Sequence, residues 1–211
     1  MKKFVIAITR TCGSGGTTIG KMLADHYKIN MYDRELLRLA SDDSGISMAM
    51  FEKADENTRK TNLFNVSRKV YSGEVIPPEN NDFTSNDNLF NYQAKVMREL
   101  CLVESYVVIG RCADYVLQNY PDVIKIFMHA SRDFCISHQM EKFNVTYVEA
   151  VKTIDKMNKY RSGYYKYHAG RKWEDMSNYD LCLNTGVLGF ENSAELIKKY
   201  VELKSAVSGI D

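Results

Sequence analysis

The chain has 211 residues, of which 45% are hydrophobic and 26% charged, and its formal net charge is +1; this composition is typical of a soluble globular protein. Proteins that bind duplex nucleic acid usually carry a strong basic excess, so the balanced charge argues against a nucleic-acid partner. No apolar run approaches the ~20 residues of a membrane span. Five scattered cysteines without a C-x-x-C pair argue against a disulfide framework and favour the reducing cytoplasm.

Short apolar runs alternate with helical patterns along the chain. The predicted strands are residues 3–8, 29–32, 106–109, 122–131 and 181–183. The predicted helices are residues 17–27, 34–60 with a break at 42–45, 90–103, 132–160 and 191–205. Residues 73–88 are rich in Pro, Asn, Asp and Ser, which predicts a mobile loop. Alternating strands and helices indicate an α/β domain with a central parallel sheet.

Three polar or glycine-rich segments follow the ends of predicted strands: residues 13–16, residues 110–111 and residues 129–131. Ligands of open α/β sheets bind outside the carboxyl ends of the strands. We therefore expect these segments to converge at one edge of the sheet.

The first of these segments partly fits the phosphate-loop pattern G-x-x-x-x-G-K-[ST]. With Thr17 as the final residue, Gly15 is the last Gly, but Arg10 stands at the first Gly position and Gly16 at the Lys position. The glycines still allow successive backbone N–H groups to turn inward around an anion. The loop also feeds a predicted helix N-terminus, which favours negative charge.

Two other interpretations of this loop remain open. Residues 13–18 nearly fit the dinucleotide pattern G-x-G-x-x-G, and Asp33 lies where a ribose-binding acid belongs. Thr18 is the misfit, since it puts a branched side chain where helix and strand pack tightest. The segment could also be a plain strand-to-helix turn.

Two further places carry cations. Arg111 follows a predicted strand, where it could grip a phosphate with two hydrogen bonds or form a structural ion pair with Asp114. Residues 159–173 combine five Lys or Arg with four Tyr and one Trp in an alternating pattern. This segment suits a basic lid over phosphates, a stacking surface for single-stranded nucleic acid, or a solvated helix face.

Taken together, six segments resemble the cytidylate kinase-like family of P-loop nucleoside monophosphate kinases. They are "GSGGTTIGK", "YDRELLRLA", "SGISMAMFEKADE", "VIGRCADYVL", "NKYRSGYYKYHAGRKW" and "NYDLCLNTGVLG". The resemblance implies a three-layer α/β/α P-loop fold with a central parallel sheet. It also implies an inserted helical acceptor lobe at residues 33–100 and a helical lid at residues 140–175. This branch of the family usually lacks the P-loop Lys.

The resemblance implies a role for each matched residue. ATP phosphates would lie on Gly13, Ser14, Gly15, Gly16, Thr17 and Thr18 with Arg10 beside them, and Thr17 would face Mg²⁺. The donor base would lie near Asn184 and Thr185, the acceptor nucleotide near Asp33, Arg34 and Arg111, and the lid cations would be Lys159 and Arg161. Arg111, Lys159 and Arg161 are the expected catalytic residues, since phosphoryl transfer needs alignment and positive charge more than a general base.

Two departures from the family keep an alternative open. The places where the family helix carries two Arg are Cys135 and His138 here, and the lid motif begins with Asn158 where Asp is usual. The leading expectation is Mg-ATP-dependent transfer to a nucleoside monophosphate such as CMP or dCMP. The alternatives are a nucleotide-binding regulatory protein without kinase activity and, more remotely, a single-strand binder or a nicotinamide oxidoreductase. Small nucleotides are the expected partners, and the sequence leaves the oligomeric state open, a homo-oligomer included.

Overall fold

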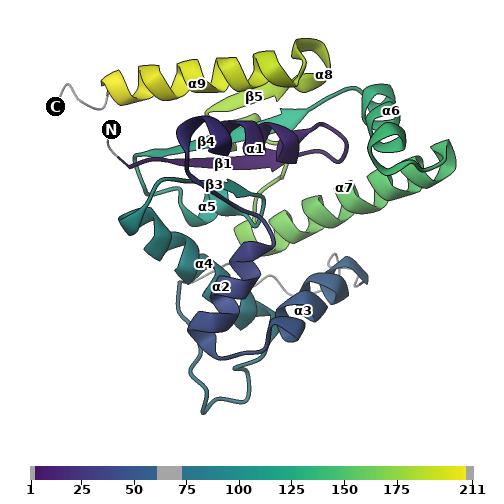
Figure 1. The fold of residues 1–211 in the computed structure, drawn as a ribbon. Coiled ribbons are helices and arrows are strands. Elements are labelled where there is room, and N and C mark those ends of the chain that lie inside the picture. The colour runs from purple at the N-terminus through teal and green to yellow at the C-terminus, as the bar shows by residue number, and fades with distance from the viewer. Residues whose placement is uncertain (1–2, 61–72, 208–211) are drawn as a thin grey trace.

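The computed structural model of the protein describes residues 3–60 and 73–207. Five strands in this part of the chain form one sheet: β1 (Val5–Arg10), β2 (Asn30–Tyr32), β3 (Tyr106–Ile109), β4 (Val123–His129) and β5 (Leu181–Asn184). All neighbouring strands are parallel, in the order β2-β3-β1-β4-β5 (Figure 1). The predicted α/β domain with a central parallel sheet is confirmed.

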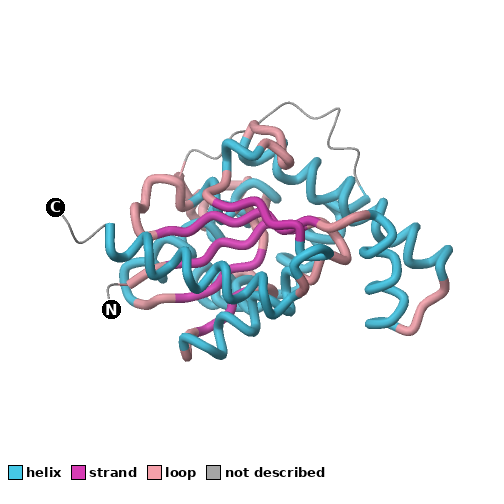
Figure 2. The backbone as a smooth tube through the Cα atoms, turned by 90° about the horizontal axis from the view of Figure 1, so that it is seen from above, coloured by secondary structure: helices cyan, strands magenta, loops and turns pink. Residues whose placement is uncertain are grey.

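Helices cover both faces of the sheet (Figures 1 and 2). They are α1 (Gly16–Tyr27), α2 (Glu35–Ser44), α3 (Met48–Lys60), α4 (Asn86–Val103), α5 (Ala113–Val116), α6 (Arg132–Phe143), α7 (Tyr147–Ala169), α8 (Thr185–Leu188) and α9 (Phe190–Val207), with a short 3-10 helix at Met176–Asn178. Helices α1 and α9 pack on one face, and α2, α4 and α5 pack on the other. None of the helices in the described segments combines the length and apolar character of a membrane span.

Strand β1 shows why the strands read as unbroken apolar runs. Ile6 and Ile8 pack in the cluster under α1 and α9, whereas Val5 and Ala7 pack in the cluster with α2, α4 and α5. Both faces of a covered parallel sheet are buried, so its strands need apolar residues at every position. The carboxyl ends of these strands point toward α6 and α7 (Figure 1).

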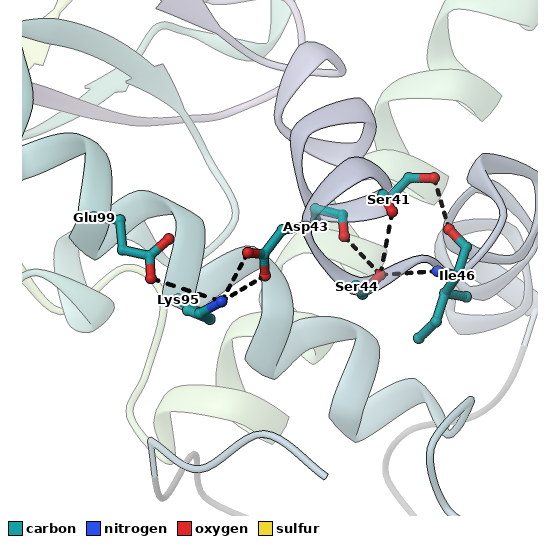
Figure 3. Close-up of polar contacts among 7 residues, drawn as sticks. Ser41, Asp43, Ser44, Ile46, Lys95 and Glu99 are labelled. Atoms are coloured by element: carbon teal, nitrogen blue, oxygen red, sulfur yellow. Dashed lines mark hydrogen bonds and ion pairs between the residues drawn. The ribbon is translucent and has the colours of Figure 1, made fainter. Parts of the chain in front are cut away.

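The helices below the sheet are joined by polar contacts at the end of α2 (Figure 3). Lys95 of α4 forms an ion pair with Asp43 of α2 at 2.7 Å. The Ser41 hydroxyl donates to the Ile46 carbonyl at 2.6 Å, and the Ser44 hydroxyl accepts from the Ile46 N–H at 3.1 Å. The two serine bonds fix the turn between α2 and α3, and the ion pair ties α2 to α4. Residues 61–72, which belong to the predicted acceptor lobe and adjoin the predicted loop, lie outside the described residues.

The start of the helix predicted over residues 90–103 was wrong. Helix α4 begins at Asn86 rather than at residue 90, because the Ser85 hydroxyl caps it by accepting from the Asn88 N–H. The buried Asn88 amide also bonds to the backbone of Ile76 and Phe83, which anchors part of the segment predicted as a mobile loop.

The predicted helix over residues 132–160 is two helices. Helix α7 restarts with a capping box, in which Thr146 and Glu149 satisfy each other's backbone N–H groups. It then continues through the aromatic and basic segment and ends at the left-handed Gly170. The extra turns place tyrosines of this segment, among them the buried Tyr165, against the core cluster that includes α2, α4 and α5.

Candidate active site

A cavity of about 390 Å³ lies at the carboxyl ends of β1 and β3, against helix α7. Among the described residues that line it are four arginines, Arg10, Arg34, Arg111 and Arg161, and a single acid, Asp33. The expected convergence of strand ends is thus seen for β1 and β3. Guanidinium groups bind phosphate oxygens in pairs, so this composition suits a ligand with several phosphates.

The glycine loop, residues 11–16, connects two residues that line this cavity, Arg10 and Thr17, and it packs tightly against α6. A Cβ atom on Gly13 would lie 2.6 Å from the carbonyl oxygen of Cys135, and Gly13 has a left-handed φ of 88°. Both facts require glycine at this position. The buried Ser14 hydroxyl donates to the Thr11 carbonyl at 2.9 Å, so its side chain holds the loop rather than facing the cavity.

Helix α1 begins at the end of this loop without a side-chain cap. Its N-cap residue is Gly15, which has no side chain that could cap the helix. The side chains of Ser85, Ser131 and Thr146, in contrast, cap α4, α6 and α7. The first N–H groups of a helix have no partner within the helix, so those of α1 are left for an anion. Thr17, in this first turn, is exposed and lines the cavity.

The predicted donor-base residues lie at the end of β5. The Thr185 hydroxyl is fully buried and donates to the carbonyls of Ser14 at 2.7 Å and His129 at 3.1 Å. Thr185 therefore positions the glycine loop and has no side-chain surface left for a ligand. Asn184 is half-buried, and its Oδ1 is enclosed with no hydrogen-bond partner among the described residues.

Arg10 ends β1 and reaches the cavity. Its Nε is enclosed and has no hydrogen-bond partner in the described part of the chain. Burial lowers the pKa of Arg10 to about 9; Arg161 and Arg111 lower it as well, and Asp33 opposes them. Asp33 is half-buried and Arg34 is exposed, so the acid balances part of the positive charge at the start of the predicted acceptor lobe.

The turn after β3 holds Arg111 in a strained conformation. Gly110, Arg111 and Cys112 all have left-handed backbones, with φ of 73°, 59° and 54°. This region costs a non-glycine residue about 1–2 kcal/mol. Strain of this kind is characteristic of functional sites, and here it accompanies the placement of Arg111 at the cavity.

This strain can be measured by comparing Arg111→Gly with Arg111→Ala, since both variants lose the guanidinium. We expect the unfolding free energy of the glycine variant to exceed that of the alanine variant by about 1 kcal/mol, because glycine adopts a left-handed φ without a Cβ clash. Urea titration measures the difference. The same pair at Arg34, whose φ is −74°, is the control and should favour Ala. If Arg111→Gly were no more stable than Arg111→Ala, the backbone would not be strained.

Helix α7 is docked on the end of β1 and on the glycine loop. The Arg161 Nη1 donates to the Arg10 carbonyl at 3.1 Å, and the Asn158 Oδ1 accepts from the Cys12 N–H at 2.7 Å. Asn158 thus has a defined role that its sequence position alone did not reveal. Lys159, in contrast, is exposed and does not line the cavity. Burial raises the pKa of the Cys12 thiol, which argues against a nucleophilic thiolate.

The two α6 residues that stand where the family resemblance implied arginines contact the glycine loop. Cys135 is buried directly against Gly13, and the His138 Nδ1 bonds to the Gly13 carbonyl at 2.7 Å. Another α6 residue brings a cation to this region, since the Lys142 Nζ donates to the Thr18 hydroxyl at 3.4 Å. Helix α6 therefore supports the loop and contributes positive charge one turn later.

A buried acid beside the cavity ties three elements together. Asp114 of α5 accepts from the Tyr165 hydroxyl at 2.6 Å and from the Thr9 hydroxyl at 3.3 Å. Burial raises the pKa of Asp114 to about 6, against the effect of these hydrogen bonds. Sequence reasoning considered Asp114 only as an ion-pair partner of Arg111, because the contact with Tyr165 spans 51 residues.

A second, smaller cavity of about 20 Å³ shares Arg111 with the first and lies between α4 and α7. Its wall includes Phe90 and His168, whose rings stack at 3.9 Å. Gln93 also lines it, and the buried Gln93 Oε1 has no hydrogen-bond partner among the described residues. Arg111 therefore stands between a cationic cavity and an aromatic one.

Comparisons with known proteins agree with this geometry. The chain is similar to the crystal structure of an uncharacterized protein from Eubacterium ventriosum, with 26% identity, a TM-score of 0.69, and coverage of 95% of this chain and 99% of that one. It shares its fold with a shikimate kinase from Bacteroides thetaiotaomicron, at 11% identity and a TM-score of 0.50 over 94% of this chain and 98% of the other. No curated protein matches. The model of the cytidylate kinase-like family matches residues 5–187, and the chain belongs to this family.

Proposed function

We propose that this protein is a Mg-ATP-dependent phosphotransferase that acts on a nucleoside monophosphate, with CMP or dCMP as the first candidates. The observation that carries the proposal is the joining of four arginines and an uncapped helix N-terminus at one cavity. Two phosphorylated ligands that react with each other need this concentration of positive charge. Phosphoryl transfer depends on alignment and on charge placed at the transferring group.

The donor is assigned to the glycine loop. Its backbone N–H groups and the start of α1 would hold the ATP phosphates, with Arg10 beside them. Mg²⁺ binds through nucleotide phosphates, water and few protein oxygens, which fits the exposed hydroxyl of Thr17. The described residues contain no cluster of three His, Cys, Asp or Glu side chains that could hold a metal by itself, so the phosphates would supply the missing ligands. Mg²⁺ would neutralise charge on the transferring group.

The acceptor is assigned to the part of the larger cavity beside Arg111. Arg111 lines this cavity together with Asp33 and Arg34, so it can hold the acceptor phosphate there. Asp33 and Arg34 line the larger cavity at the start of the proposed acceptor lobe, residues 33–100. The smaller cavity, at about 20 Å³, has room for about one water molecule, and the buried rings of Phe90 and His168 stack on each other, so the nucleoside is assigned to the larger cavity.

Arg161 is the strongest candidate for charge on the transferring phosphate. It lies on the proposed lid, residues 140–175, and is already held at the end of β1 through the Arg10 carbonyl. Lys159 would reach the same phosphate only after a movement of α7, because its side chain is exposed outside the cavity. A closed lid would also exclude water, whose attack on ATP is the competing reaction.

A nucleotide-binding regulatory protein is the second candidate. It is favoured by one observation: Cys135 and His138, at the places of two family arginines, pack on Gly13 and bring no permanent positive charge to the cavity. Lys142 near Thr18 partly offsets this loss. The two functions differ in turnover, since both predict binding of ATP.

An acceptor screen distinguishes them. ADP release is followed with Mg-ATP and each nucleoside and deoxynucleoside monophosphate in turn, and thermal unfolding is followed with ATP, NAD and a short oligonucleotide. Acceptor-dependent ADP release supports the kinase. Stabilisation by ATP without turnover for any acceptor supports the regulatory protein. Stabilisation by NAD or the oligonucleotide alone would overturn both.

A further inference from the structure

The two departures from the phosphate-loop pattern meet in space. Arg10 stands at the position of the first Gly and Gly16 at the position of the Lys. We propose that they form one exchange: Arg10 supplies the phosphate-binding cation that a lysine supplies in other loops, and residue 16 is Gly because Arg10 occupies its space. The proposal rests on the proposed function, since it concerns the ATP phosphates.

The space around Arg10 shows the coupling. A Cβ atom on Gly16 would lie 2.8 Å from both Cβ and Cγ of Arg10. Contacts below 3.0 Å are not found for a real Cβ, and these are with the rigid start of the side chain rather than its flexible end. A lysine at position 16 is therefore incompatible with this course of the Arg10 side chain.

A second glycine receives the other end of the side chain. A Cβ atom on Gly110 would lie 2.2 Å from the Arg10 Nη1. The Arg10 side chain thus runs from the end of β1, across Gly16, to the turn after β3. Gly16 and Gly110 each leave room for a different part of it, which explains why a full-length arginine fits here.

The guanidinium lies where a phosphate would need it. Arg10 lines the cationic cavity, and its enclosed Nε has no hydrogen-bond partner among the described residues. Arg161 and Arg111 lower its pKa, and Asp33, the acid that lines the same cavity, offsets only part of their effect. A buried donor without a partner beside two like charges is unfavourable in the absence of an anion. A polyphosphate chain accepts such bonds in pairs and balances the charge.

The exchange is tested with a cycle of variants: Arg10→Gly, Gly16→Lys and both together. The double variant restores the full pattern G-x-x-x-x-G-K-T. Isothermal titration measures binding of Mg-ATP, of inorganic tripolyphosphate and of adenosine. Arg10→Gly is expected to weaken the binding of ATP and of tripolyphosphate by the same ~10–100-fold, the value of one charged hydrogen-bonded contact. The affinity for adenosine is expected to stay unchanged. Gly16→Lys is expected to weaken the binding of both ATP and tripolyphosphate and to lower the melting temperature.

The double variant is expected to bind ATP more tightly than either single variant. If Arg10→Gly bound ATP and tripolyphosphate as tightly as the parent protein, or if the folded double variant bound no better than the weaker single variant, the exchange would be wrong while the proposed function stood. If the parent protein bound neither ATP nor tripolyphosphate, both would fall.

A second cycle keeps the test valid should Gly16→Lys fail to fold. Gly16→Ala adds only the Cβ atom, so it is expected to lower the melting temperature in the parent protein and to have a smaller effect in an Arg10→Gly background. An equal loss in both backgrounds would show that Arg10 does not occupy the space of residue 16.

Discussion

Replacement of Arg161 by Ala is expected to lower kcat for acceptor-dependent ADP release by ~10³-fold, with a much smaller change in the KM for ATP. An arginine at the transferring phosphate is worth this much or more, because it binds charge that develops only in the transition state. The expectation depends on the position of Arg161, whose Nη1 lies 3.1 Å from the Arg10 carbonyl oxygen at the edge of the cavity. Steady-state kinetics with the best acceptor of the screen provide the measurement.

Controls on the same helix separate a local effect from general damage to the lid. Lys156→Ala removes an exposed cation of α7 that does not line the cavity and is expected to leave kcat within about twofold, as a surface substitution should. Arg161→Lys keeps the charge but loses the paired hydrogen bonds and is expected to fall between the two. A kcat for Arg161→Ala within tenfold of the parent value would remove Arg161 from the catalytic role.

The second large effect concerns acid stability and arises from His168. This residue is buried and stacks on Phe90, and burial lowers its pKa to about 3. The unfolded chain takes up a proton below pH 6.5, whereas the folded protein does not until about pH 3. The contribution of the neutral imidazole to stability is therefore complete above pH 6.5 and is lost as the pH falls toward 3.

A His168→Phe variant should be spared this loss, because Phe keeps the ring stack and does not titrate. From pH 7 to pH 4, we expect its unfolding free energy to rise relative to the parent protein by about 3 kcal/mol, as the shift of the pKa implies. Urea titrations at both pH values measure the difference. His26→Asn, on the exposed side of α1, controls for the loss of one imidazole. The unfolding free energies of His168→Phe and the parent protein could instead differ by the same amount at both pH values. That result would contradict the burial of a neutral His168.

The comparison of the variant with the parent protein matters because Asp114 changes the acid stability in the opposite direction. Burial raises its pKa to about 6, so the folded protein binds a proton there between pH 6 and 3.8, and this contribution grows as the pH falls. The fall in the unfolding free energy of the parent protein at acid pH would therefore understate the effect of His168. The difference between the two proteins removes the Asp114 contribution.

The sheet and the cavity at its carboxyl edge could be predicted because they depend on local patterns. Runs such as residues 106–109 are apolar at every position, and a glycine-rich turn after the first run marks the carboxyl edge. The same patterns brought Arg111 and Arg10 to this edge. Helix boundaries that are set by a single capping side chain were harder to predict, as the early start of α4 at its Ser85 cap shows.

Contacts between distant segments could not be predicted from the chain alone. Thr185 was expected beside the donor base, but its hydroxyl is used by the Ser14 and His129 carbonyls. Lys159 and Arg161 are two residues apart, and the direction of α7 decides that Arg161 lines the cavity. The fit of Arg10 over Gly16 depends on the path of a side chain from the end of β1 to the turn after β3. The sequence pattern shows only that both residues depart from the phosphate-loop motif.

The most direct test of the central claim is ADP release by the parent protein with Mg-ATP in the presence of each nucleoside monophosphate. One or a few acceptors, CMP or dCMP first among them, are expected to raise the rate well above the rate with ATP alone, and Arg161→Ala is expected to abolish this increase. A protein that binds ATP but releases ADP at the same rate with every acceptor and with none would contradict the assignment as a nucleoside monophosphate kinase.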